Sequence, residues 1–164
     1  MLDRRSLALG ALSALVAATA APGRAVAMPA AFSSVSVDVG PLRAKGLGPY
    51  ADHVRTVMGA ALGRAFAGRI GGTGPRLVVR IDAVSLRSYA GGEGRFGFGN
   101  ATNNDYMEGE GLVVDARGGV IGRYPQLFAS PASNGGPWYV EGVEDRQLAA
   151  LAENFAGWMR RKFD

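Results

Sequence analysis

The hydrophobic residues of this chain change their spacing several times, and each spacing predicts one structural element. Apolar and polar residues alternate over 34–39, which predicts a strand that is buried on one face. From Tyr50 onward the apolar residues recur at helical spacing, which predicts a helix with Pro49 in its first turn and the glycines at 71–72 at its end. The glycines and prolines within 40–49 predict a loop between these two elements.

The next predicted strand, 76–89, contains a change of phase. Leu77, Val79 and Ile81 share one face, whereas the next large apolar residues, Val84 and Leu86, have the opposite parity. A change of parity within one strand is typical of a β-bulge, which we expect near residues 82–83. The side chains expected to face the core from the first half of this strand are those of Leu77, Val79 and Ile81.

The remaining sequence predicts a hairpin followed by a helix. The expected segments are a Gly/Asn-rich loop at 91–105, strands at 106–115 and 120–128 around a turn at 117–119, a loop at 131–137 and a helix at 143–162. Acidic residues in the first turn of this helix and basic residues in its last turn favour the helix dipole. Its apolar stripe consists of Val143, Leu148, Leu151, Phe155, Trp158 and Met159.

The order β-α-β-β-β-α predicts an α+β fold. Two amphipathic helices need one apolar sheet face to cover. We therefore expect a two-layer sandwich, in which a mostly antiparallel four-stranded sheet carries both helices on one face, and a single small domain that spans 28–164. The other sheet face is expected to carry Arg76, Arg80, Asp82, Glu108, Glu110 and Arg123.

Residues 1–27 have the layout of a secretory signal peptide. Two arginines precede an apolar run, and the segment ends on a small-x-small pattern that suits cleavage. The apolar run at 7–21 is shorter than the ~20 residues that a membrane-spanning helix needs. We therefore expect a periplasmic or secreted bacterial protein with no transmembrane span in the mature chain. The residues that carry the export and cleavage signals are Arg4, Arg5, Ala25 and Ala27.

The segment Asp-Arg-Arg-Ser-Leu at 3–7 resembles the twin-arginine export consensus, in which a Ser/Thr-Arg-Arg stem is followed one residue later by Phe-Leu. Leu7 and Ala8 stand at the Phe and Leu positions, and Asp3 replaces the Ser or Thr. The resemblance implies a protein that is exported in its folded form. The general secretory route is the alternative, because the motif is imperfect.

Composition narrows the chemistry open to the chain. The 164 residues include no Cys and one His, which excludes disulfides, thiolate metal sites, a cysteine nucleophile and a His-rich metal site. The formal charge is +4, but removal of 1–27 leaves 15 basic and 13 acidic residues. This small excess does not favour nucleic acid as a partner, and we expect no cofactor and no bound metal.

The order of the elements resembles the lipopolysaccharide-assembly-lipoprotein-like family of small envelope domains. The resemblance covers about residues 33–163 and consists of a long second strand, a hairpin that turns at Asp-x-x-Gly and a charged final helix. It implies a small envelope domain. The chain lacks the lipobox cysteine of such lipoproteins, so the resemblance does not extend to a lipid anchor.

The segment 92–97 matches the G-x-G-x-x-G pattern of phosphate-binding loops. No helical pattern follows it, and the V-A-I-K, H-R-D and D-F-G motifs of protein kinases do not occur in the sequence. We interpret this segment as a connecting loop and expect no nucleotide binding there.

Glu108 and Glu110 lie two residues apart on one predicted strand, so their carboxylates point to the same face. Such a pair can perform acid–base catalysis, but arginines of the preceding strand are its expected neighbours, which favours an ion-paired surface. His53 flanks the apolar stripe of the first helix, and no G-x-S-x-G motif supplies a nucleophile, so we interpret it as a half-buried structural histidine. A secreted hydrolase that uses Glu108, Glu110 or His53 is the alternative function.

Four aromatic residues in predicted loops are the candidate contacts with a partner. They are Phe96, Phe98, Trp138 and Tyr139. We expect them at one end of the sandwich, facing an envelope protein, a lipid or a glycan; packing back over the sheet edge is the other interpretation. The sequence therefore favours a non-enzymatic binding or assembly module of the cell envelope.

Overall fold

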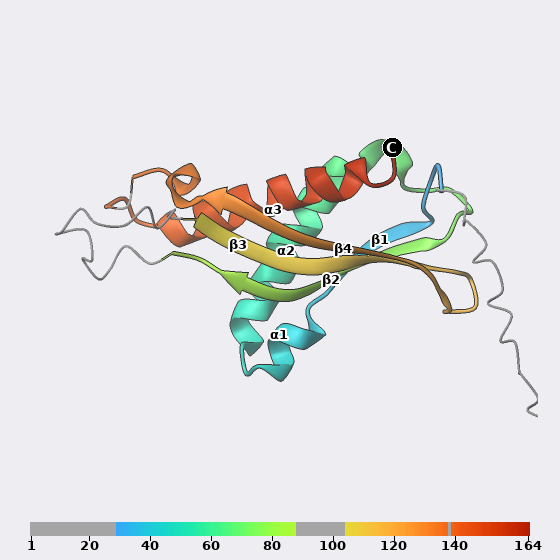
Figure 1. Cartoon of the computed structure of the whole chain (residues 1–164), viewed down its shortest axis with the longest axis horizontal. Coiled ribbons are helices and arrows are strands. Elements are labelled where there is room, and N and C mark those ends of the chain that lie inside the picture. Colours follow the sequence, from blue (N-terminus) through green and yellow to red (C-terminus); the bar gives the residue numbers. More distant parts are fainter. Residues whose placement is uncertain (1–28, 88–103, 138) are drawn as a thin grey trace, which may run out of the picture.

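The computed structural model describes residues 29–87, 104–137 and 139–164, and Figure 1 shows how their elements are arranged. In chain order the elements are β1 (Ser34–Asp38), α1 (Gly40–Ala44), α2 (Gly48–Ala65), the 3₁₀ helix η1 (Ala67–Arg69), β2 (Arg76–Ser85), β3 (Asn104–Val114), β4 (Val120–Pro131), the 3₁₀ helix η3 (Ala132–Gly135) and α3 (Val143–Arg161). The predicted signal peptide at 1–27 lies outside the described residues.

The four strands form one sheet in the order β1-β2-β3-β4. β1 runs parallel to β2, whereas the other two neighbouring pairs are antiparallel. The parallel pair requires a long crossover, which α1 and α2 provide. α2 and α3 pack against one face, and the opposite face is turned toward the viewer in Figure 1. The predicted α+β sandwich with a mostly antiparallel sheet is confirmed.

β2 contains the predicted β-bulge. The register of β2 against β3 shifts between Ile81 and Ala83, so Asp82 has no partner residue on β3. Leu77, Val79 and Ile81 are fully buried in the core between the sheet and the helices. Both the position of the bulge and the core-facing side chains of β2 are confirmed.

α1 lies where the sequence predicted a loop, and that prediction is wrong. Pro41 occupies the first turn of this helix, where its missing N–H would have had no partner within the helix. Leu42 is buried in the core, and Lys45 Nζ donates a 2.8 Å hydrogen bond to the carbonyl of Asp82 at the bulge. A helix of five residues has no readable periodicity, and these tertiary contacts hold it in place.

Other boundaries also differ from the prediction. β2 ends at Ser85 rather than 89, and β3 begins at Asn104, inside the predicted Gly/Asn-rich loop. α2 ends at Ala65, and Phe66 follows it fully buried, so the glycines at 71–72 lie well beyond the helix. β4 continues to Pro131, three residues past the predicted end, and η3 occupies part of the predicted loop that follows. In both places burial and strand pairing, rather than local glycine and proline signals, determine where the element ends.

Aromatic rings close one end of the core. Phe32, Phe66 and Phe163 pack edge to face, with ring centroids 5.9, 5.2 and 6.1 Å apart. The ring of Tyr124 on β4 lies 4.7 Å from that of Phe163. This cluster joins the segment before β1 to the residues after α3.

α3 packs most of its apolar stripe into the same core, as predicted. The buried members of the stripe are Leu148, Leu151, Phe155 and Met159. The acidic first turn and basic last turn are also confirmed. Trp158 is instead 51% exposed, because it lies at the margin of the stripe, beside β4.

Within the described ranges, no helix combines the length and the apolar character that crossing a membrane requires.

Candidate functional site

The end of β2 and the start of β3 meet the start of α3 at one end of the sandwich (Figure 1). The N–H of Arg87, just beyond β2, donates a 2.7 Å hydrogen bond to Oδ1 of Asp105 on β3. Gln147 on α3 donates from Nε2 to the carbonyls of Arg87 and Ala132, at 3.5 and 3.4 Å. Asp105 and Gln147 are both buried, so polar side chains inside the fold fix the points at which the β2–β3 connection leaves and returns.

Burial raises the pKa of Asp105, and the hydrogen bond from Arg87 opposes part of this rise. A carboxyl group whose pKa is higher in the folded chain than in the unfolded chain stabilises the fold while it is protonated. This contribution is lost as the pH rises through the pKa of the folded chain. Ionisation of Asp105 as the pH rises therefore lowers the stability of the sandwich.

We expect Asp105→Asn to raise the free energy of unfolding at pH 7, because the amide still accepts from Arg87 but buries no charge. The gain should shrink as the pH falls toward 3.8, where the wild-type carboxyl group becomes protonated in both states. Urea unfolding of both proteins across this pH range measures the difference. Glu108→Gln is the control, because it removes the charge of an exposed side chain. The prediction is contradicted if Asp105→Asn, but not this control, is less stable than wild type at pH 7.

Arg146 holds the segment before α3 in one shape. Its guanidinium group donates to the carbonyls of Gly135, Val140 and Glu141, at 2.7, 3.3 and 2.8 Å. Tyr139, within the segment held in this way, is 74% exposed. The side chain of Arg146 thus fixes the backbone around the exposed Tyr139.

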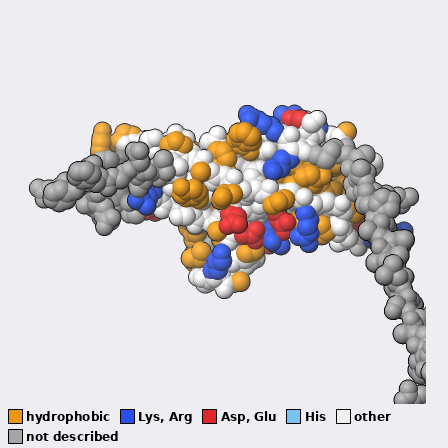
Figure 2. Space-filling model, in the orientation of Figure 1, with side chains coloured by type: hydrophobic (Ala, Val, Ile, Leu, Met, Phe, Trp, Pro, Cys, Tyr) orange, Lys and Arg blue, Asp and Glu red, His pale blue; other side chains and the backbone are white. Residues whose placement is uncertain are grey.

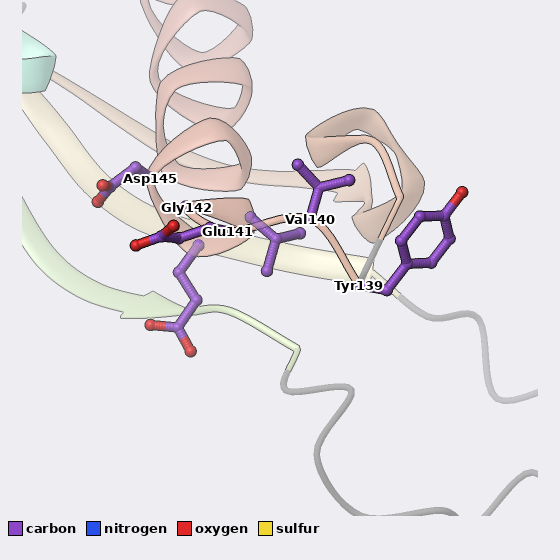
Figure 3. A pocket seen from close by; sticks show the side chains of 7 residues that line it. Tyr139, Val140, Glu141, Gly142 and Asp145 are labelled. Atoms are coloured by element: carbon purple, nitrogen blue, oxygen red, sulfur yellow. The ribbon is translucent and has the colours of Figure 1, made fainter.

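An open hollow of about 390 Å³ borders the same segment (Figure 3). Its lining residues are Tyr139, Val140, Glu141, Gly142, Val143, Glu144 and Asp145. Figure 3 shows the side chain of Tyr139 pointing away from that of Asp145. The hollow is therefore acidic on one side, and the aromatic ring stands apart from its carboxylates.

Tyr139 is the one predicted partner contact among the described residues, and it lies just before α3, at the end of the sandwich where β2 finishes and β3 begins (Figure 3). The remaining predicted contacts and the export residues lie outside the described residues; they are Phe96, Phe98, Trp138, Arg4, Arg5, Ala25 and Ala27. The glycine pattern at 92–97 also lies outside them. The gathering of four aromatic residues at this end stays a prediction.

Glu110 lies in a ladder of ion pairs on the open sheet face. Arg80 on β2 and Arg123 on β4 approach its Oε1 to 2.8 and 3.0 Å, and Arg80 also pairs with Asp82 at 3.0 Å. Figure 2 shows acidic and basic side chains gathered on this face beside hydrophobic ones. The arginine neighbours expected for this carboxylate are present, and they bind it in structural ion pairs.

His53 lies on α2, on the other side of the sheet from Glu110. Its Nε2 is 3.1 Å from Oδ1 of Asp145, so it links α2 to the start of α3. Its side chain is 44% exposed, and the neighbouring Val54 takes the core position. Glu108 and Glu110 point from β3 to the open face, so the three hydrolase candidates do not converge. In the part of the chain that the structure describes, no three His, Cys, Asp or Glu side chains are grouped as metal ligands.

A second surface feature, which we call the β4–α3 groove, was missed by the sequence reasoning. It has a volume of about 320 Å³ and is lined by Pro125, Gln126, Leu127, Phe128, Trp158 and Lys162. The guanidinium of Arg161 lies 4.6 Å from the centroid of the Trp158 ring. The available signal was the position of Trp158 directly before Met159, about 100° around the helix from a core residue.

A mixed sheet with two helices on one face defines the class of α+β two-layer sandwiches. No family model matches the chain, and no curated protein matches it as a relative. Among solved structures, a minor lipoprotein from Acinetobacter baumannii is similar at 12% identity with a TM-score of 0.37, covering 82% of this chain and 92% of that chain.

Proposed function

We propose that this protein is a non-enzymatic binding or assembly module of the bacterial cell envelope, exported through its N-terminal signal to the periplasm or beyond. It contacts its partner through the end of the sandwich that carries Tyr139. The observation that carries the proposal is the set of three hydrogen bonds from Arg146, which hold the backbone around this exposed ring. A rigid loop that presents an aromatic side chain loses little entropy on binding.

Phe96, Phe98 and Trp138 complete this surface in our proposal. Trp138 directly precedes Tyr139, and the two phenylalanines belong to the connection whose ends are fixed beside Asp105. Aromatic side chains are the commonest residues to dominate binding energy at interfaces, and an envelope protein, a lipid or a glycan would all offer apolar surface to them. The hydrolase alternative has no comparable support, because Glu110 is engaged by two arginines and His53 lies across the sheet.

The contact surface is tested by capture from the envelope fraction of the producing cell. We expect Tyr139→Ala to weaken retention of the partner by about tenfold or more, the size of effect that a central aromatic contact gives. Ile121→Ala removes an exposed apolar side chain at the start of β4, beside the β3–β4 turn, and should leave capture unchanged. Equal capture by wild type and the combined Phe96, Phe98, Trp138 and Tyr139 alanine variant would overturn the proposal.

Export is tested at the paired arginines. Changing Arg4 and Arg5 together to lysine should abolish export, because the twin-arginine pathway recognises the guanidinium pair rather than its charge. Cell fractionation and N-terminal sequencing measure the outcome, and we expect the exported protein to begin at Met28. A single Arg24→Lys change outside the motif is the control. Unchanged export of the double variant would assign the protein to the general secretory route.

A further inference from the structure

The β4–α3 groove joins an edge strand to a helix. β4 pairs with β3 alone among the described strands, so its other side carries no strand. Leu127 on β4 and Trp158 on α3 are 68% and 51% exposed, and both line the groove. Leu127 faces the open side of the sheet, as does its register partner Glu108, whereas Trp158 lies on the α3 side, so this strand edge has exposed apolar side chains on both faces. Exposed apolar side chains beside a strand edge are a feature of surfaces that receive another chain.

The backbone of β4 shows which of its groups face the groove side. Pro125 has no N–H for the ladder, and its carbonyl accepts a 3.0 Å hydrogen bond from Lys162 Nζ. We infer from both features that the backbone groups of residue 125 face away from β3. Backbone groups alternate in direction along an antiparallel strand, and the register is regular from residue 125 to 131. The N–H and C=O groups of Leu127 and Ala129 therefore also face outward.

Prolines close this open stretch at both ends. Pro125 and Pro131 have the same outward parity as Leu127 and Ala129, and neither can donate to an added strand. Between the two prolines a short window remains in which another backbone can pair with β4, and Arg123, which has the same parity, lies outside it. Such a window suits a short extended segment and hinders the unlimited edge-to-edge pairing that leads to aggregation.

The charges beside the groove indicate what kind of segment fits. Arg161 stacks on Trp158, and Lys162 binds a backbone carbonyl. Neither cation is ion-paired with a carboxylate of the described residues, whereas most other described arginines have such a partner. An acidic side chain on the incoming segment would complement both cations.

We propose that the β4–α3 groove binds an extended segment of a partner protein, with alternating apolar and acidic side chains, as a short added strand beside Leu127–Ala129. An apolar side chain of the segment packs on Leu127 at the open face, and an acidic one on the α3 side, beside Trp158, pairs with Arg161 or Lys162. Backbone pairing satisfies the outward N–H and C=O groups of β4, which an acyl chain cannot do. This second surface is separate from the one around Tyr139 and goes beyond the proposed function.

The probe is a synthetic peptide of eight alternating Val and Glu residues, titrated into the isotopically labelled protein. We expect saturable shifts of the Trp158 indole N–H signal and of the Leu127 and Ala129 amide signals, with a Kd in the range of about 0.1–1 mM. Two matched peptides isolate the proposed contacts. Replacing Glu by Lys should weaken binding by about tenfold or more, and N-methylation of alternate backbone amides should abolish it.

Protein variants separate this groove from the loop surface. Trp158→Ala should lose binding of the Val/Glu peptide, whereas Tyr139→Ala should keep it. Undiminished binding of the N-methylated peptide would overturn strand addition. So would shifts caused only by phosphatidylglycerol vesicles, or dimerisation that covers the groove, since a lipid or a second copy would then be the occupant. The absence of saturable shifts with the Val/Glu peptide would also overturn it. The envelope-capture result for Tyr139→Ala tests the proposed function alone, and neither outcome of that experiment bears on this groove.

Discussion

Phe155→Ala should lower the free energy of unfolding by about 3–5 kcal/mol, the cost of removing a fully buried aromatic side chain. Phe155 lies at the centre of the stripe by which α3 packs on the sheet. Gln126 Nε2 also donates to its backbone carbonyl at 2.9 Å, which anchors this turn of the helix to β4 and limits how far the site can collapse. The unfilled volume should therefore persist in the variant and add to the transfer cost.

Urea unfolding measures this loss, provided that the dependence of the free energy of unfolding on urea concentration is the same for both proteins. Trp158→Ala, three residues further along the same helix, is the matched control, because its side chain is half exposed and should cost far less. If Phe155→Ala lowers the free energy of unfolding by less than about 1 kcal/mol, Phe155 does not pack between α3 and the sheet as described.

Gly109→Ala should destabilise the sandwich by about 1–3 kcal/mol, the cost of overpacking at a position that cannot yield. Gly109 lies on β3 opposite the bulge, and a Cβ placed there would come within 2.2 Å of the carbonyl oxygen of Arg80. This neighbour is backbone of the central sheet, so the contact can be relieved only by moving the strands apart. The bulge therefore depends on a glycine in the facing strand.

Gly59→Ala is the matched control, with the opposite expected sign. Gly59 lies on an exposed position of α2, and a Cβ there would have nothing within 4 Å. Alanine in a helix interior is more favourable than glycine by roughly 0.5–1 kcal/mol. Thermal unfolding should therefore show a lower midpoint for Gly109→Ala and a higher one for Gly59→Ala, and equal signs would contradict the model of the bulge.

The sequence predicts those elements that are long enough for their apolar residues to repeat several times at one spacing. The parity change between Ile81 and Val84 predicted the bulge, because a register shift moves every later side chain to the other face. α1 could not be predicted, since its few residues are held by Leu42 in the core and Lys45 at the bulge. These contacts exist only once β2 is in place.

The candidate sites divide in the same way. The sequence left two interpretations of Tyr139 open, because an aromatic side chain in a Gly/Pro-rich segment can face a partner or pack back over the sheet edge. The structure has it exposed. The clamp formed by Arg146 was not predictable, since its three acceptors are carbonyls that the fold brings to it. The β4–α3 groove was hidden for another reason. Trp158 is apolar and near the helical spacing, and only the position of β4 shows that it lies outside the core.

Because β1 pairs with β2 in parallel, we expect the sheet to form in two steps, the β3–β4 hairpin first and the β1–β2 pair later. The β3–β4 hairpin closes over a short turn in which the Asp115 carboxylate accepts from the N–H groups of Arg117 and Gly119, and such hairpins form within microseconds. β1 can join β2 only after the whole α1–α2 crossover is ordered, so loop-closure entropy delays it. During that delay the outer edge of β2 is open to other chains, and the rate of folding sets how long it is exposed to aggregation.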